Sequence, residues 1–161
     1  MNFYRAPITR ITKTRQQGVV VIEFALVITL LISLMAGIFE FGRAFWYYDA
    51  LTKATRDGAR LMSLSVKTTI ASQGVQAAKD LVVNDVKNAG VPGFVNGNVS
   101  VICLDANFAD TSCADNTAPG GIRVQITGYT VNIGQYIPFL LGASSNYTST
   151  LSPHTTMRYM L

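Results

Sequence analysis

Glu23 is a carboxylate inside an apolar segment, and its chemistry needs an explanation. Residues 19–39 read VVVIEFALVITLLISLMAGIF, and Glu23 is the only ionisable side chain among these 21 residues. A charge near the middle of a membrane helix costs about 2.5–3.5 kcal/mol on insertion scales, and less near a helix end. We expect Glu23 either to pair with a positive charge at membrane depth or to reach the cytoplasmic interface without a partner.

The other reactive residue types form no catalytic pattern. His154 is the single histidine, and no nucleophile motif accompanies it. No glycine-rich phosphate loop follows an expected strand, and no cysteine and histidine cluster has zinc spacing. Oxygen ligands between residues 105 and 115 could bind calcium, but they do not match the spacing of an EF-hand. We expect no catalytic residue, no cofactor and no metal, and a protein that is not an enzyme.

Cys103 and Cys113 are the two cysteines of the chain. Both lie in the part that we expect outside the cytoplasm, where an oxidising compartment lets thiols pair. A disulfide closing this loop of 11 residues would add about 2.5–3 kcal/mol in the chain-entropy treatment. The alternative is two unpaired thiols.

Positive charge is concentrated before the apolar segment. The net charge is +4, and no acidic residue precedes Gly18, whereas four basic residues do: Arg5, Arg10, Lys13 and Arg15. The nine basic and nine acidic residues that remain cancel, so the folded part has no excess of basic residues and we expect no nucleic-acid partner. Positive charge at this position holds the N-terminus in the cytoplasm and directs the rest of the chain across the membrane.

The apolar segment has the length of a membrane-spanning helix. At about 1.5 Å per residue it covers about 30 Å of hydrocarbon. A cleaved secretory signal is the alternative, but its apolar core is only about 7–15 residues long and ends at small residues. Here EFGR follows the segment of 21 residues. We therefore predict a single-pass membrane protein with its N-terminus in the cytoplasm and its C-terminal domain on the other side of the membrane.

Helical periodicity continues beyond this segment. Residues 44–64 contain no proline and carry one apolar or small stripe: Leu51, Ala54, Thr55, Gly58 and Met62. We predict one long helix whose second half packs this stripe on a domain. Glycines at positions 37, 42 and 58 mark kinks or close approaches of another helix. A second helix is expected over 69–89, with one apolar face: Val75, Ala78, Val82, Val86 and Ala89.

Strand-forming residues follow Pro92. Runs of β-branched and aromatic residues predict strands at 99–104, at 122–131, and at 147–151 continuing into 155–159. Pro153 interrupts the last run, which indicates a bulge or an edge strand. The predicted fold class is α+β: a long N-terminal membrane-spanning helix extends into a small soluble domain with a second helix and a small antiparallel sheet.

These elements divide the chain into four expected segments. They are a basic cytoplasmic leader at 1–18, a transmembrane helix at 19–39, an extension of the long helix at 40–66, and an extracytoplasmic α+β domain at 67–161. Within the last segment, the apolar stretch from Tyr136 to Leu141 either caps the core, touches the membrane or faces a partner.

A group of residues just beyond the apolar segment is expected at the outer membrane interface. Glu40 and Arg43 have the i, i+3 spacing of an ion pair on a helix. The alternative is that they contact another subunit. Trp46, Tyr47 and Tyr48 follow as an aromatic belt that fixes the depth of the helix.

The sequence GVVVIEF at residues 18–24 resembles the start of type IV pilins, in which a glycine precedes a cleavage site and a glutamate follows five residues later. The longer stretch 18–60 is similar to TadE-like minor pilins of the tight-adherence, or Flp-type, pilus system. Three motifs carry this resemblance: GVVVIEFA at 18–25, FEFGR at 39–43 and ATRDGAR at 54–60. The sequence TMR at 156–158 is also similar to the closing strand of the family.

The resemblance implies that a prepilin peptidase cleaves between Gly18 and Val19. Val19 stands where the major type IV pilins have phenylalanine, so methylation of the new N-terminus is not implied. The freed amino group of one subunit could pair with Glu23 of its neighbour and set the register between subunits, because the two charges compensate each other in lipid. The other partners implied are further pilin and minor pilin subunits, an inner-membrane assembly platform and membrane lipid.

The expected function is that of a minor pilin or pilus-assembly subunit in adhesion and surface colonisation. The subunit would reside in the inner membrane before it enters or assists an extracellular pilus. An alternative function is a membrane-tethered periplasmic binding or sensor domain, for which the helix is a plain anchor.

Overall fold

The structure of the chain is a computed structural model that describes residues 14–134 and 147–161. The chain divides into two compact units, Met1–Ile38 and Phe39–Leu161. The helical elements are α1 (Thr14–Ser63), the short turns η1 (Lys67–Thr69), η2 (Ile70–Gly74) and η3 (Asn96–Asn98), and α2 (Val75–Asn88). The strands are β1 (Val99–Leu104), β2 (Asp110–Thr111), β3 (Gly121–Ile126), β4 (Tyr129–Ile133), β5 (Tyr147–Leu151) and β6 (His154–Arg158).

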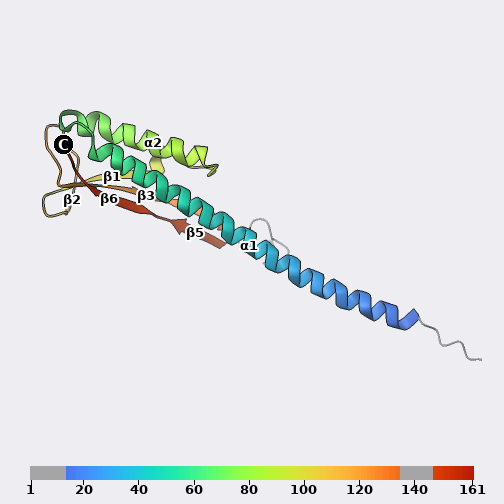
Figure 1. Cartoon of the computed structure of the whole chain (residues 1–161). Coiled ribbons are helices and arrows are strands. Elements are labelled where there is room, and N and C mark those ends of the chain that lie inside the picture. The colour runs from blue at the N-terminus through green and yellow to red at the C-terminus, as the bar shows by residue number, and fades with distance from the viewer. Residues whose placement is uncertain (1–13, 135–146) are drawn as a thin grey trace, which may run out of the picture. The chain divides into compact units, whose positions relative to one another are not determined.

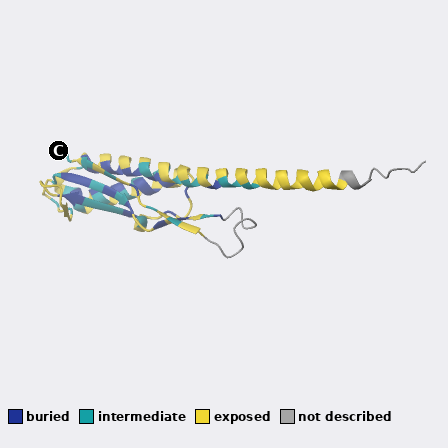
Figure 2. Ribbon diagram, turned by 90° about the horizontal axis from the view of Figure 1, so that it is seen from below, coloured by how far each residue is buried: buried dark blue, intermediate teal, exposed yellow. Residues whose placement is uncertain are grey.

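In the first unit, α1 exposes nearly all of its apolar side chains. Every residue from 18 to 32 is exposed, which Figure 2 shows in yellow. The helix from Gly18 to Ser63 contains an 18-residue window of mean hydropathy 2.7, none of which is buried. By length and composition this helix could cross a membrane.

In the second unit, the C-terminal part of α1 and α2 lie side by side on one face of the sheet (Figure 1). The predicted stripe of α1 is buried at all five positions: Leu51, Ala54, Thr55, Gly58 and Met62. On α2, four residues are buried: Ala78, Val82, Val83 and Val86. They pack with the inward residues of the sheet in one apolar core, so both helix faces predicted from periodicity are confirmed.

Among the glycines of α1, Gly58 is the one that lies close against other elements. A Cβ atom at this position would lie 2.6 Å from Val82 Cγ2 on α2 and 3.6 Å from Val124 Cγ1 on β3. The predicted close approach of a helix therefore occurs here, and the helix is α2 of the same chain. At Gly37 and Gly42 a Cβ atom would have nothing within 4 Å, and α1 continues through both positions.

The start of the second helix differs from the prediction. The helical path begins at Ile70, but its first five residues form the π-helical turn η2, and regular α-helix runs only from Val75. Gly74, the last residue of this turn, is buried, and a Cβ atom there would lie 3.3 Å from Met62 Sδ of α1. The missing side chain lets the turn pack closely against α1.

The strands form two antiparallel sheets. The larger has the order β2-β1-β3-β6, and the smaller pairs β4 with β5. In the larger sheet Ile122, Val124 and Ile126 of β3 are fully buried in the core. Strand β6 lies at an edge of this sheet directly after Pro153, as the sequence indicated. The α+β fold class is confirmed.

The expected single strand over 122–131 is wrong. It breaks at Thr127 and Gly128 into β3 and β4, which belong to different sheets. Gln125 pairs with His154, and Tyr129 pairs with Leu151, so three residues on one side oppose two on the other. Gly128 has a φ of +68°, a conformation that residues with a Cβ rarely adopt. The extra residue forms a bulge, and it turns the β4–β5 pair away from the β3–β6 pair.

Candidate functional site

The candidate site is helix α1 together with the residues that join it to the domain. In the first unit Glu23 is exposed, and no salt bridge of the described side chains involves it. The polar residues deeper in the segment behave differently. Thr29 Oγ1 donates to the Ala25 carbonyl at 2.8 Å, and Ser33 Oγ donates to the Thr29 carbonyl at 2.7 Å.

These hydroxyl groups are satisfied within the helix itself, as a lipid environment requires. A carboxylate cannot be satisfied in this way, because ionised Glu23 has no hydrogen to donate to a carbonyl. In a membrane, Glu23 would therefore need either a partner outside its own helix or contact with the interface.

Gly18 and Val19, the residues at the expected cleavage site, lie within α1. A Cβ atom at position 18 would have nothing within 4 Å, and Val19 is 65% exposed. The described residues therefore leave the peptide bond between them uncovered by the fold.

Glu40 and Arg43 join α1 to the smaller sheet of the second unit. Arg43 Nη2 lies 2.7 Å from Glu40 Oε2, and the same nitrogen donates to the Asn132 carbonyl of β4 at 2.6 Å. Glu40 is only 3% exposed. The Arg43 guanidinium also lies 5.8 Å from the centroid of the Tyr47 ring. The expected pair of i, i+3 charges is present, and it holds the helix to a strand 89 positions later in the chain.

The aromatic residues that follow divide between the domain and solvent. Trp46 Nε1 donates to the Ala89 carbonyl at the end of α2, 3.1 Å away, although the side chain is 60% exposed. Tyr47 packs against the core. Tyr48 is exposed, and so is Phe45 one turn before it. The expectation that this group lies at the membrane interface stays a prediction.

An apolar pocket of about 300 Å³ lies between this part of α1 and the smaller sheet. Its lining residues are Phe41, Ala44, Phe45, Tyr48, Ile133, Ser149 and Leu151. The exposed aromatic face of the helix therefore continues onto β4 and β5. The stretch from Tyr136 to Leu141, which connects these strands, lies outside the described residues.

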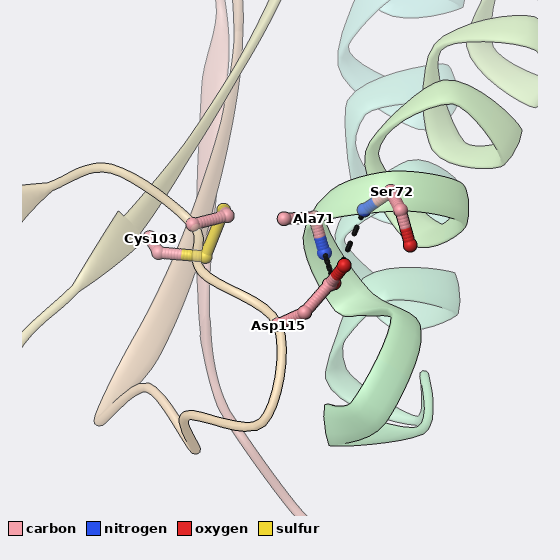
Figure 3. Close-up of a disulfide and its surroundings, with 5 residues drawn as sticks. Ala71, Ser72, Cys103 and Asp115 are labelled. Carbon is pink, nitrogen blue, oxygen red and sulfur yellow. Dashed lines mark hydrogen bonds between the residues drawn. A yellow bond between two sulfur atoms is a disulfide. The ribbon is translucent and has the colours of Figure 1, made fainter.

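The predicted disulfide between Cys103 and Cys113 is present. Figure 3 shows that the loop after this disulfide passes beside the turn η2, with the Asp115 side chain directed toward Ala71 and Ser72. There Asp115 Oδ1 accepts hydrogen bonds from the backbone N–H groups of Ala71 at 2.7 Å and Ser72 at 3.1 Å. The Asn116 N–H donates to the Lys67 carbonyl at 2.8 Å. The disulfide loop thus ties β1 to η1 and η2, the two short turns that follow α1.

Asp115 has an electrostatic role that the sequence did not reveal. Hydrogen bonds from the Ser72 side chain and from the backbone of Ser72 and Ala71 lower the pKa of Asp115. Its negative charge also faces the N-terminal end of the helical segment formed by η2 and α2, where free N–H groups favour anions. Asp115 and the residues that it caps are 43 or 44 positions apart, so no local pattern could have shown the contact.

The remaining residues considered as chemical candidates are dispersed. His154 is exposed on β6, where it pairs with Gln125. In the segment considered for calcium, Asp105 Oδ1 accepts from the N–H groups of Asn107 and Ala109, and Asp110 forms a salt bridge with Arg123. Each of these acidic groups is engaged in a local structural contact.

Helix α1 therefore combines an exposed apolar surface, one carboxylate within it, and a charged anchor at the domain. The comparison with family models bears directly on this helix. Residues 18–60 match the family described as TadE-like protein. The matching segment begins at Gly18, before the expected cleavage site, and ends at Arg60, in the part of α1 that carries the buried stripe.

The resemblance predicted from the sequence is thus confirmed over this segment. Comparisons with curated proteins and with solved structures found no match.

Proposed function

We propose that the protein is a minor pilin or pilus-assembly subunit of a tight-adherence pilus, and that it acts by helix assembly and not by catalysis. The observation that carries this proposal is the position of Glu23. It is the one carboxylate in the apolar segment 19–39, and this segment lies within residues 18–60, which match the TadE-like family.

The first step of the proposed mechanism is removal of the basic leader. A prepilin peptidase on the cytoplasmic side cleaves the bond between Gly18 and Val19, and the new N-terminus of Val19 carries a positive charge. The uncovered surroundings of Gly18 and the exposure of Val19 support this step. Four basic residues leave with the leader, so cleavage also removes the charge that held this end in the cytoplasm.

The second step is pairing between subunits. The amino group of one subunit meets Glu23 of a neighbour, and each charge supplies the counter-ion that the other lacks in lipid. Within one mature chain, Glu23 and the terminal nitrogen of Val19 lie about one helical turn apart on the same segment. Pairing between chains would therefore fix a defined axial offset between two parallel helices.

The apolar surface of α1 serves both states of the subunit. In the inner membrane the exposed side chains of residues 19–39 contact lipid. In a filament the same side chains contact the helices of other pilins, so no apolar surface needs to enter water. The domain beyond the helix then lies in the periplasm or on the pilus surface, and the partners are the peptidase, other pilin subunits and the assembly platform.

Substitution of Glu23 tests this proposal in cells that assemble the pilus. Glu23→Gln keeps the size and polarity of the side chain but removes its charge, and Glu23→Ala removes the group altogether. We expect both variants to insert in the membrane. They should then either be absent from the pilus fraction or reduce the amount of pilus that the cells assemble. Thr29→Val is the matched control, because the Thr29 hydroxyl bonds only within its own helix among the described contacts.

Normal pilus assembly by both Glu23 variants would refute the pairing step. An intact leader in cells with active prepilin peptidase, with the protein confined to the membrane fraction, would favour the alternative function, a membrane-tethered binding or sensor domain with α1 as a plain anchor.

A further inference from the structure

The exposed surface of α1 stays uncharged well beyond the apolar segment. Among residues 24–48 the only charged side chains are those of Glu40 and Arg43. Glu40 is buried, and Arg43 forms the ion pair with it and donates to a carbonyl of β4. The domain therefore takes up the two charges that would otherwise interrupt the apolar surface of the helix. The next charged residue along α1 is Asp49, which is exposed.

This uncharged surface is longer than the hydrocarbon core of a membrane. At about 1.5 Å per residue, residues 24–48 extend over about 37 Å, whereas the core is about 30 Å thick and the bilayer with its headgroups about 40–45 Å. The last two turns of the stretch carry three exposed aromatic residues: Phe41, Phe45 and Tyr48. They therefore reach the layer in which acyl chains meet headgroups, where aromatic side chains are enriched.

The apolar pocket between α1 and the smaller sheet lies beside these three aromatic residues, which line it from the helix. Strands β4 and β5 supply the other wall through Ile133, Ser149 and Leu151. Apart from the hydroxyl groups of Tyr48 and Ser149, the lining side chains are apolar, and none of them is charged. Such a lining favours hydrocarbon and offers a charged headgroup no partner.

We propose that this pocket holds part of an acyl chain of a membrane phospholipid, so that β4 and β5 contact lipid together with α1. A volume of about 300 Å³ suits one linear chain. A helix with its side chains is about 10–12 Å across, so the helix of another subunit could insert a single side chain at most. The bound chain removes apolar surface of the pocket from water and holds the smaller sheet at the membrane.

The inference rests on the proposed location of α1 in the membrane. It does not depend on cleavage at Gly18 or on pairing by Glu23.

Quenching of tryptophan fluorescence by brominated lipids tests the proposal on the full chain. It is reconstituted in vesicles of phosphatidylethanolamine and phosphatidylglycerol whose acyl chains carry bromine, which quenches a tryptophan in contact with them. Trp46 is the single tryptophan and does not line the pocket. In a Trp46→Phe background, Tyr48→Trp places the reporter in the pocket.

We expect Tyr48→Trp to lose a larger share of its fluorescence than Trp46 of the wild type. An aromatic belt without an occupied pocket predicts the reverse order, because residue 48 lies about 3 Å farther along the helix from the apolar segment.

A charge placed in the pocket tests whether the acyl chain enters it. In the Tyr48→Trp background, Ser149→Arg should abolish the additional quenching, since hydrocarbon does not pack on an ionised group. Thr150→Arg is the matched control, because Thr150 is the next residue of β5, is exposed and does not line the pocket. It should leave the quenching unchanged. Melting curves by circular dichroism check that both arginine variants are folded.

Leu30→Trp, in the Trp46→Phe background, reports insertion separately, since Leu30 lies near the middle of the apolar segment. Strong quenching at position 30 with none at position 48 would overturn the pocket proposal and leave membrane insertion intact. A protein segment in the pocket would give the same result. Equal quenching in the Ser149→Arg and Thr150→Arg variants would also overturn it. No quenching at position 30 would overturn both the pocket proposal and the membrane location on which it rests.

Discussion

Replacement of Gly58 by alanine tests how α1 is packed on the domain. In an unhindered helix this change stabilises by about 1 kcal/mol, because alanine has the higher helix propensity. Here the new Cβ would lie 2.6 Å from Val82 Cγ2, closer than side chains pack. Val82 is fully buried, and a valine in a helix has one strongly preferred rotamer, so it cannot easily turn away.

Overpacking of a core costs about 1–3 kcal/mol. We place Gly58→Ala in the upper part of that range, because the clash involves a rigid side chain on a neighbouring helix. After subtraction of the gain in propensity, the expected net loss in the free energy of unfolding is about 1–2 kcal/mol. The steric effect should therefore win over the local preference.

Urea unfolding of the full chain in detergent micelles measures this loss. Trp46 is the single tryptophan and bonds to the end of α2, so its fluorescence reports the separation of the two helices. Gly42→Ala is the matched control on the same helix, because a Cβ atom there meets nothing within 4 Å. It should be neutral or stabilise by up to about 1 kcal/mol.

The double variant Gly58→Ala with Val82→Ala removes the clashing methyl group. Its loss of stability should be smaller than the sum of the two single losses. The reasoning is refuted if Gly58→Ala is as stable as the wild type while Gly42→Ala behaves as expected.

Three further predictions concern the disulfide loop and the anchor of α1. Cys103→Ser should lower the free energy of unfolding by about 2.5–3 kcal/mol, seen as a lower urea midpoint, and a reductant should shift the wild type but not the variant. Because hydrogen bonds lower the pKa of Asp115 in the folded state, its contribution is complete above the unfolded pKa of about 3.9 and is lost as pH falls through the folded value. The wild type should therefore lose more stability than Asp115→Ala between about pH 5 and pH 2, and equal losses would contradict the cap. Trp46→Phe should lower the melting temperature measured by circular dichroism, since it removes the hydrogen bond to Ala89, whereas Phe45→Leu, at an exposed position, should leave it unchanged.

The helices could be predicted from the sequence because their signals are local. The stripe on α1 and the apolar face on α2 repeat with the helical period, and each buries the residues that this period selects. The disulfide followed from the presence of only two cysteines in a segment expected outside the cytoplasm.

The strand break at Thr127 and Gly128 could not be predicted in the same way. The run from 122 to 131 is rich in β-branched residues, and a glycine inside such a run is compatible with a continuous strand. What decides the break is the count of residues between two pairings, one with β6 and one with β5, both far along the chain. Register of this kind is a property of the assembled sheet.

The contacts of Arg43 and Asp115 were missed for a related reason. Both side chains reach backbone groups that are tens of positions away, and a backbone carbonyl or N–H group has no sequence signature. The sequence marked Arg43 as charged and near Glu40, but only the fold shows that Asn132 lies beside it. The candidate site was thus recognised by its residues, while its attachment to the domain was not.

The central claim is that α1 is an assembly helix that is activated by cleavage. Mass spectrometry of the N-terminus, applied separately to inner-membrane and sheared pilus fractions of producing cells, tests it most directly. The account predicts a chain that begins at Val19 in both fractions, and an intact leader only in cells that lack the prepilin peptidase. A chain that keeps residues 1–18 in cells with active peptidase, and that is found only in the membrane fraction, would contradict it.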